Sequence, residues 1–367
     1  MRIKRIEPIA VSLPMARPMK MAGVLIESAE NLLVRIESQD GVVGWGEAAS
    51  APTMTGETPE SMVAAVRHLT PSLIGADAGD ITALSQKMEA RMYGNQGAKA
   101  AIEIALHDLV GHALSKPVHA LLGEKRRSRV PTLWLVGTGS MHGDIAEAAE
   151  KKAAGFVAYK IKVGVDGARA DAQRTTRICE VLGEGSLISA DANQGFNAEQ
   201  AVEYARAVQE TALDFFEQPV RADDLAGMAT VARASQVAIG ADEGLHSIAD
   251  IQRHADAGAA SGGSLKTIKL GGLRGAMRAA QLCESLRWKV NLACKIAESS
   301  IATAAILHLA AAVPSIDWGV SLSSQYLAAD VTRSPIAVMN GHATVPEGPG
   351  LGVEVDEALV RKYQIRP

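Results

Sequence analysis

From about residue 130 to residue 325, short apolar runs alternate with longer segments in which apolar residues recur at helical spacing. The short runs are typical of buried strands, and the longer segments are typical of helices that cover a sheet. Eight strands are predicted, at 132–136, 158–163, 187–190, 214–217, 237–242, 264–270, 289–294 and 316–321. Seven helices are predicted between them, at 144–154, 168–182, 197–211, 224–235, 247–255, 274–286 and 299–313.

This alternation predicts a parallel (β/α) barrel of the TIM type. An open, doubly wound sheet is the competing architecture. The open sheet is disfavoured because no Gly-x-Gly-x-x-Gly sequence follows the first strand.

The first part of the chain shows a different pattern. Residues 3–13 and 31–48 resemble strands, and Asp40-Gly41 lies where a hairpin turn is expected. Three helices are predicted downstream, at 59–70, 82–93 and 98–114. Strands followed by helices indicate an α+β domain. We therefore expect three parts: an α+β domain at 1–126, a catalytic barrel at 127–325, and a C-terminal segment at 326–367 that returns to the first domain.

Composition and charge exclude several classes of protein. The 367 residues are 47% hydrophobic and 21% charged, which is ordinary for a globular protein. Because the net charge of −4 is small and the basic residues are dispersed, we expect no nucleic-acid partner. The longest apolar stretch, 301–313, is too short to span a bilayer, and no signal peptide is recognisable. Three cysteines without a Cys-x-x-Cys pair favour a reducing, cytoplasmic compartment.

Five consecutive predicted strands carry charged residues at or near their ends. In chain order these residues are Lys160 and Lys162, Asp191, Glu217, Asp242 and Lys266. From Lys162 onward they are separated by 29, 26, 25 and 24 residues, about one strand, one helix and two loops. Active-site residues of (β/α) barrels lie where strands end. In a ring of eight strands the second and sixth face each other, so the lysines are expected to flank the three carboxylates.

Three carboxylates without a nearby Cys or His form a hard oxygen site that suits Mg²⁺, with Mn²⁺ as the alternative. Such an ion would leave open positions for a small-molecule carboxylate substrate and would stabilise the charge formed when the adjacent carbon loses a proton. Burial and cationic neighbours favour the neutral form of a lysine. We therefore assign Lys162 as the base, and we expect Lys160 to tune it and to contact the substrate carboxylate.

Each of these charged residues has an ordinary alternative interpretation when it is taken alone. A single Asp or Glu at a strand end is often a helix cap or a solvated loop residue. The ordered set on five consecutive strands is much harder to obtain by chance. Asn193 is either a cap of the helix near 197 or a supporting group behind the metal ligands. Glu243 is expected to support the ligands or to pair with a lysine.

At these residues the sequence closely resembles the enolase superfamily, and within it the muconate lactonizing enzyme subgroup. The resemblance covers essentially the whole chain. It rests on eight runs: KIK at 160–162, DAN at 191–193, EQP at 217–219, ADE at 241–243, LKTIKLGG at 265–272, GVVGWGEA at 41–48, AAIEIALHDLVG at 100–111 and PEGPGLG at 346–352.

The resemblance implies a modified TIM-type (β/α) barrel with an N-terminal α+β capping domain that the C-terminal segment completes. It also implies a divalent metal, usually Mg²⁺, bound by Asp191, Glu217 and Asp242. Lys162 and Lys266 correspond to the acid/base groups, since a lysine base with Mg²⁺ is established in this superfamily. Homo-oligomers are common among its members, so a homo-oligomer is expected.

The subgroup includes muconate cycloisomerases, o-succinylbenzoate synthases, N-acylamino acid racemases and dipeptide epimerases, which all pass through an enolate. The seventh-strand run 289–299 has no His, which argues against the mandelate racemase branch. Residues 317–319 (DWG) lack the second Asp of dipeptide epimerases, and 17–22 resembles the substrate-covering loop of cycloisomerases. Lys295 is expected to pair with a second carboxylate, and Glu298 matches a family position near the pocket. We therefore expect a metal-dependent cycloisomerase, an intramolecular lyase, that acts on a muconate-like dicarboxylate.

Other residues keep alternatives open. Trp134 stands where lactonizing enzymes more often have a small hydroxyl residue, and 55–57 (TGE) is shared with epimerase-like relatives. The alternative is a racemase or epimerase of N-acylamino acids or dipeptides, or an o-succinylbenzoate synthase-like dehydratase. Lys295 is equally interpretable as a solvated lysine. From other classes, a Schiff-base aldolase with Lys162 or Lys266 as nucleophile and a barrel that only binds a ligand remain.

Overall fold

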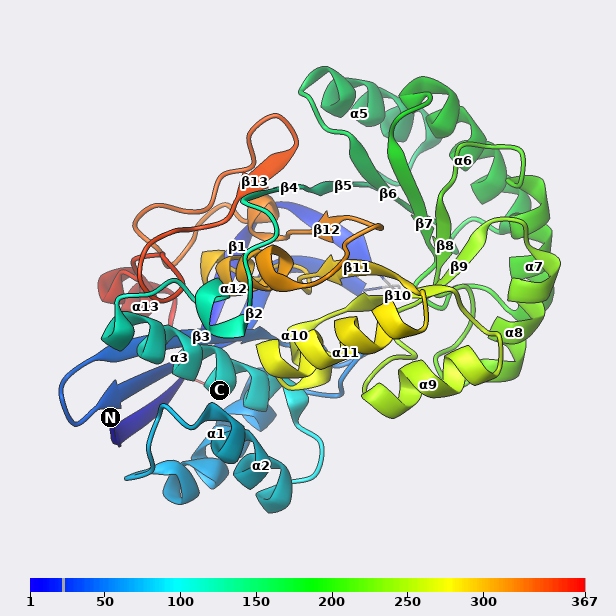
Figure 1. Cartoon of the computed structure of the whole chain (residues 1–367). Coiled ribbons are helices and arrows are strands. Elements are labelled where there is room, and N and C mark those ends of the chain that lie inside the picture. Colours follow the sequence, from blue (N-terminus) through cyan, green and yellow to red (C-terminus); the bar gives the residue numbers. More distant parts are fainter. Residues whose placement is uncertain (22–23, 367) are drawn as a thin grey trace.

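The computed structural model describes residues 1–21 and 24–366. In Figure 1 the N-terminal elements, in blue and cyan, form one body, and the strands and helices coloured green to orange form a second body beside it. The C-terminal segment, in red, lies beside the N-terminal elements. This is the predicted combination of a (β/α) barrel with an α+β capping domain.

The capping domain begins with a three-stranded antiparallel sheet in the order β1-β2-β3. Its strands are β1 (Ile3–Met21), β2 (Val24–Ser38) and β3 (Val43–Ala49). The predicted Asp40-Gly41 turn joins β2 to β3, and Gly41 has a φ of +81°, a conformation that favours glycine.

The hairpin of β1 and β2 is longer than the sequence predicted. Its pairing continues to Met21 and Val24, with an irregularity between Pro14 and Met19. The segment Arg17–Met21, which we expected to be part of a covering loop, is therefore strand; Ala22 lies outside the described residues. Proline lacks a backbone N–H and is tolerated in strands at edges and irregularities, which explains why the pattern concealed this extension.

The three predicted helices of the capping domain are confirmed, as α1 (Pro59–Leu73), α2 (Ile81–Arg91) and α3 (Gln96–Leu114), and a short helix, α4 (His119–Leu122), follows. Helix α3 packs directly on β3. A Cβ atom at Gly44 would lie 2.3 Å from the Ala105 oxygen, and one at Gly46 would lie 2.0 Å from the Ala101 oxygen. The two glycines therefore permit a close approach between helix and sheet that no larger residue would allow.

The barrel has eight parallel strands in sequential order. They are β5 (Leu133–Val136), β6 (Ala158–Lys162), β7 (Leu187–Asp191), β8 (Phe215–Glu217), β9 (Ala238–Ala241), β10 (Gly262–Leu265), β11 (Lys289–Ala293) and β12 (Val320–Ser321). A parallel bridge between Thr132 and Val320 brings the two ends of the sheet together. Trp318 fills the interior, where it stacks on Phe215 with ring centroids 4.1 Å apart.

All seven predicted barrel helices are confirmed, and they surround the strands in Figure 1. They are α5 (Met141–Ala153), α6 (Ala168–Leu182), α7 (Ala198–Ala207), α8 (Leu225–Ala234), α9 (Ile248–Asp256), α11 (Leu273–Ser285) and α12 (Ser300–Ala312). The predicted strand 264–270 is wrong in its second half, because β10 ends at Leu265 and Thr267–Leu270 form the short helix α10. Ile268 misled the prediction: it is buried with the capping-domain core, and not in the barrel sheet.

The C-terminal segment returns to the capping domain, as predicted. Two bridges join it to β1, between Leu327 and Met15 and between Gln364 and Val11, the latter just after helix α13 (Glu357–Tyr363). Its strand β13 (His342–Thr344) pairs with β4 (Arg129–Pro131), at the start of the barrel part of the chain.

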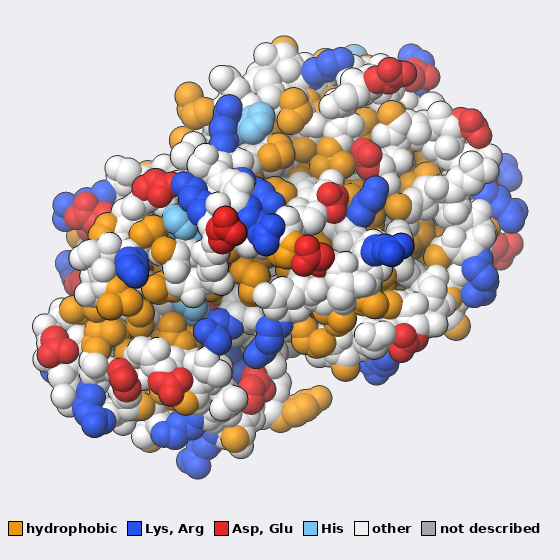
Figure 2. All heavy atoms as spheres, viewed as in Figure 1, with side chains coloured by type: hydrophobic (Ala, Val, Ile, Leu, Met, Phe, Trp, Pro, Cys, Tyr) orange, Lys and Arg blue, Asp and Glu red, His pale blue; other side chains and the backbone are white. Residues whose placement is uncertain are grey.

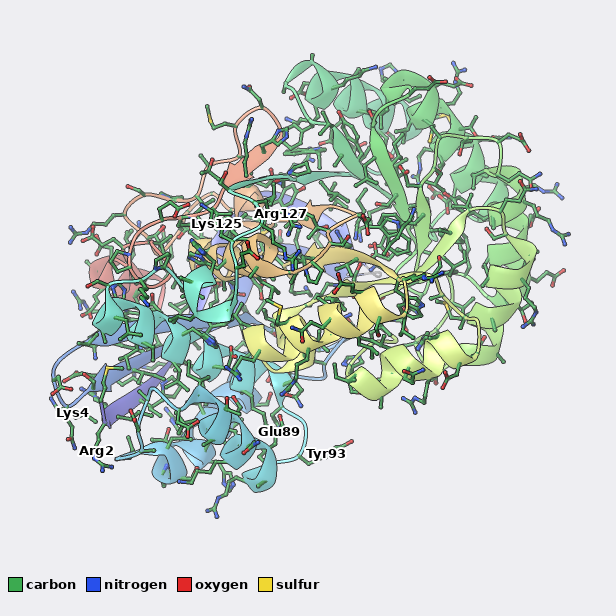
Figure 3. The ribbon with its side chains drawn as sticks, viewed as in Figure 1. Arg2, Lys4, Glu89, Tyr93, Lys125 and Arg127 are labelled. Carbon is green, nitrogen blue, oxygen red and sulfur yellow. The ribbon has the colours of Figure 1, made fainter. Side chains whose placement is uncertain are left out.

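The connection between the two bodies is fixed by basic side chains, which Figure 3 labels. Arg127 donates to the Val313 and Pro314 carbonyls, at 2.8 and 3.0 Å, just past the end of α12. Lys125 forms an ion pair with Glu347 of the C-terminal segment. On the face shown in Figure 2, basic and acidic side chains are interspersed. Within residues 1–21 and 24–366, no helix is both long enough and apolar enough to cross a membrane.

Candidate active site

The three predicted metal ligands lie side by side at one end of the barrel. Asp191, the last residue of β7, pairs in register with Glu217, the last residue of β8. Glu217 in turn pairs with Gly240 of β9, two residues before Asp242. Each of the three acidic residues is at most 2% exposed. Neighbouring strands thus present three buried carboxylates to one place.

The three predicted lysines approach these carboxylates from the flanking strands β6 and β10. Each forms an ion pair with a different carboxylate: Lys160 with Glu217, Lys162 with Asp191 at 2.6 Å, and Lys266 with Asp242. The structure therefore brings together all six charged residues that the spacing singled out.

A fourth lysine, Lys269, belongs to this cluster and was missed. Its side chain is fully buried, and its Nζ donates to the Asp242 carboxylate at 2.6 Å and to the Ser264 carbonyl at 2.9 Å. The available signal was its spacing from Lys266, because a lysine three residues further on occupies the same side of a helix. The incorrect strand prediction for 264–270 hid that spacing.

Asn193 supports the site and does not cap a helix. Asn197 caps α7, by accepting from the Gln200 N–H. The side chain of Asn193 contacts Lys162 and donates to Glu243 at 3.0 Å. Burial and the nearby Asp242 raise the pKa of Glu243 to about 7. Asn193 therefore links a predicted catalytic lysine to a buried acid.

Two further polar residues that sequence reasoning missed fix the ligands. Ser264 donates its hydroxyl to Glu217 at 2.6 Å. The Gln218 amide oxygen accepts from the backbone N–H of Asp242 at 2.8 Å and of Gly244 at 3.1 Å. Gln218 is the middle residue of the EQP run, so its place beside a ligand was the available signal. These bonds hold the carboxylate-bearing loops in position.

Ion pairs outweigh burial at three groups of the cluster, Lys160, Asp242 and Lys266. Burial alone would lower the pKa of Lys266, but the Asp242 carboxylate raises it above its usual value. The pKa of Lys160 is raised in the same way, because the nearby Glu217 carboxylate outweighs the effect of burial. Burial also favours the neutral form of Asp242, yet Lys266 holds the pKa of that carboxyl well below its usual range. At Lys160 and Lys266 a neighbouring carboxylate therefore outweighs both burial and the neighbouring cations.

The cluster faces a cavity of about 620 Å³ between the barrel and the capping domain. The capping domain contributes part of β2 and residues 50–54, and Lys266 Nζ lies 3.9 Å from Met54 Sδ. Leu133 and Leu135 of β5 add an apolar wall. The cavity is therefore large enough for a small organic acid, with charged groups at one end.

The two predicted substrate-binding residues after β11 lie in different places. Lys295 lines the cavity. Glu298 is 1% exposed and is not among the lining residues; its carboxylate accepts from the Lys295 N–H at 3.0 Å and the Ala49 N–H at 3.4 Å. Burial and the nearby Glu47 raise the pKa of Glu298 to about 8. Glu298 is therefore better placed to position Lys295 than to contact the substrate.

Glu47, in the GVVGWGEA run, joins the capping domain to the barrel. Its carboxylate accepts from the Asn31 amide at 2.7 Å, and from the Ser299 and Ala302 N–H groups at 2.9 and 3.0 Å. The last two belong to the start of α12, where an acidic side chain is stabilising. Sequence reasoning did not identify this contact, because the partners are more than 250 residues apart.

The chemistry of the donor set fits a hard divalent cation. Asp191, Glu217 and Asp242 are buried, and each carboxylate lies close enough to the others for mutual repulsion to act on their pKa values. As the side chains are arranged, no three His, Cys, Asp or Glu residues in the described part of the chain form a compact metal-binding group. Each of the three carboxylates is instead paired with a lysine.

A (β/α) barrel with a charged cluster at its strand ends, covered by a second domain, is the architecture of a barrel enzyme. Residues 144–359 match the family model described as enolase C-terminal domain-like, and residues 5–123 match that of the mandelate racemase / muconate lactonizing enzyme N-terminal domain. The chain belongs to this family of the enolase superfamily, and it is an isomerase.

Known relatives match along almost the whole chain. The chloromuconate cycloisomerase of Cupriavidus pinatubonensis is 31% identical, over 96% of each chain. Muconate cycloisomerase 1 of Rhodococcus opacus is 31% identical, over 98% of each chain. Among solved structures, the muconate lactonizing enzyme of Pseudomonas fluorescens in complex with muconolactone superimposes with a TM-score of 0.95, at 30% identity and 99% coverage of both chains. The N-succinyl Arg/Lys racemase of Bacillus cereus also gives 0.95, at 28% identity, with 100% of this chain and 99% of the racemase covered.

Proposed function

We propose that this enzyme is a metal-dependent cycloisomerase that acts on a muconate-like dicarboxylate through an enolate. One observation carries the proposal: Lys162 and Lys266 flank three buried carboxylates from β6 and β10. This arrangement offers a proton donor on one face of a bound substrate and a cation on the other. The relatives named as muconate and chloromuconate cycloisomerases support the choice of substrate class.

The reaction forms one C–O bond and one C–H bond. Lys160 orients the first substrate carboxylate. The second carboxylate adds across the conjugated double bond, and the displaced electron pair moves to the carbon beside the first carboxylate as an enolate. Lys162, whose Nζ is oriented by hydrogen bonds to Asp191 and Asn193, donates a proton to that carbon. Lys266 stabilises the negative charge from the opposite face.

Asp191, Glu217 and Asp242 would hold Mg²⁺, or Mn²⁺, in this site. The bound ion would supply Lewis-acid stabilisation of the enolate charge. Asn193 and Glu243 would keep Lys162 and the ligands in place, since such supporting contacts tune metal sites strongly.

The predictions of a homo-oligomer, of a cytoplasmic location and of domain boundaries at 126 and 325 stay predictions.

Racemisation of an N-acylamino acid is the second candidate. The same two lysines, on opposite faces of one α-carbon, are suited to remove a proton from one face and return it to the other. The match to an N-succinyl Arg/Lys racemase, with a TM-score equal to that of the lactonizing enzyme, favours this candidate over other reactions of the subgroup.

The test is an assay of the full chain with Mg²⁺ against two substrates. Loss of the muconate absorbance with formation of a lactone supports the cycloisomerase. Exchange of α-hydrogen for deuterium in both enantiomers of an N-acylamino acid, without any lactone from muconate, would overturn it in favour of the racemase. Full activity after EDTA treatment would contradict the metal-dependent mechanism for either substrate.

A further inference from the structure

Lys295 differs from the other lysines that line the cavity. Lys160, Lys162 and Lys266 each have a carboxylate partner. Among the described residues, none places a carboxylate within 4.0 Å of the Lys295 ammonium group, whose hydrogen bond goes to the Ile296 carbonyl at 3.0 Å. A half-buried ammonium group without a counter-charge costs free energy, and a bound anion would offset that cost.

The backbone of Lys295 is held on both sides. Its N–H donates to the Glu298 carboxylate at 3.0 Å, and its carbonyl accepts from the Ser323 hydroxyl at 2.8 Å. The same hydroxyl accepts from the Glu298 N–H at 2.9 Å, which closes the network. Glu298 also reaches Ala49 of the capping domain. The base of the lysine side chain is therefore fixed, as in a built binding site.

The surroundings of Lys295 are mostly apolar. It follows β11, one strand beyond Lys266 on the side away from the three carboxylates. Continuing around the barrel, the cavity is lined by Leu322 after β12 and by Leu133 and Leu135 of β5. One cation beside an aliphatic wall fits an anionic group at the end of an apolar chain.

We propose that Lys295 binds a second carboxylate of the substrate, and that the aliphatic wall contacts the carbon chain that joins it to the reacting end. This inference rests on the proposed function, because that function places the first carboxylate at Lys160. The substrate class is then an elongated dianion. Both a muconate and an amino acid acylated with a dicarboxylic acid have this chemistry.

Binding of unreactive ligands to the Mg²⁺-loaded enzyme, measured by calorimetry, tests the proposal without requiring turnover. Adipate has two carboxylates, and its monomethyl ester has one. We expect wild type to prefer adipate, and Lys295→Met to weaken adipate binding by roughly 100-fold while changing ester binding by less than about threefold. Lys295→Arg should retain most of the preference. Lys289→Met, at the exposed opposite end of β11, is the matched control and should resemble wild type.

A second pair of ligands distinguishes the two sources of the anion. N-succinylvaline and N-acetylvaline differ in the distal carboxylate of the acyl group. If wild type prefers the succinyl compound and Lys295→Met abolishes that preference, the second carboxylate belongs to an acyl chain. If only the preference for adipate is abolished, the second carboxylate belongs to a muconate-like acid. Equal weakening of mono- and dianions by Lys295→Met, or no dianion preference in wild type, would overturn the inference. If wild type prefers dianions as expected but forms no lactone from muconate, only the proposed function is overturned.

Discussion

Lys160 and Lys162 lie two residues apart on β6, yet they pair with carboxylates on different strands. Lys160 reaches across to Glu217 on β8, whereas Lys162 pairs with Asp191 on the adjacent β7. Lys160 thus pairs with the middle ligand, and Lys162, the last residue of β6, pairs with the ligand on the next strand. This difference in pairing supports two different roles: Lys160 holds the reacting carboxylate, and Lys162 transfers the proton.

Mg²⁺ should stabilise the folded protein, because it binds the native carboxylate set and not the unfolded chain. At a concentration 100 times the dissociation constant, the expected gain in the free energy of unfolding is about 2.7 kcal/mol. Asp191→Asn should lose most of this gain, and Glu210→Gln, at an exposed position, should retain it. Urea unfolding with and without Mg²⁺ measures both. Equal stabilisation of Asp191→Asn and wild type would show that Mg²⁺ binds elsewhere.

Lys269→Met should destabilise the enzyme strongly. The substitution removes a fully buried ammonium group that pairs with Asp242 and also donates to the Ser264 carbonyl. Removal of one partner from a buried ion pair typically costs about 3 to 5 kcal/mol, because the other charge stays buried. The free energy of unfolding from urea titration gives the measurement, with exposed Lys289→Met as the control. A loss below about 1 kcal/mol would contradict the assigned role.

Acid should destabilise the protein through His308. This side chain is fully buried; its Nδ1 accepts from the His119 N–H at 3.2 Å and its Nε2 lies 3.0 Å from the Leu351 carbonyl. Burial lowers the pKa of His308 to about 4, below the value of about 6.5 expected in the unfolded chain. The unfolded chain therefore takes up the proton first, and stability present above pH 6.5 is lost as the pH falls toward 4.

The expected contribution of His308 is about 3 kcal/mol between pH 7 and pH 4. His308→Gln should lose correspondingly less stability over this range, since glutamine can accept and donate in the same places without taking up a proton. His142→Gln, on the exposed start of α5, is the control and should follow the wild-type curve. Identical pH curves for wild type and His308→Gln would exclude this account.

The barrel and its charged cluster were predictable because both follow from chain spacing. Each ligand lies at a strand end, and the carboxyl ends of parallel strands meet at one side of a barrel. The placement of Asp191, Glu217 and Asp242 therefore needed only the count of strands.

The contacts that complete the site depend on distances between elements, which spacing does not encode. Glu47 meets Ser299 only because the capping domain folds over the start of α12. The role of Lys269 was obscured because the end of β10 and the short helix α10 follow each other so closely that residues 264–270 resemble a single strand. The extension of β1 to Met21 was obscured by prolines. Side-chain pairing also raises the pKa values of Lys160 and Lys266 despite their burial, and those pairings depend on distances that the sequence does not give.

The most direct test of the central claim is the reaction of cis,cis-muconate with the Mg²⁺-loaded enzyme in D₂O. We expect wild type to form a lactone with one deuterium on the carbon beside the free carboxylate, delivered to one face only. Lys162→Gln should slow this step by about 10³-fold, while Lys289→Gln should match wild type. Deuterium delivered equally to both faces, or an unchanged rate in Lys162→Gln, would contradict proton transfer from Lys162 to an enolate.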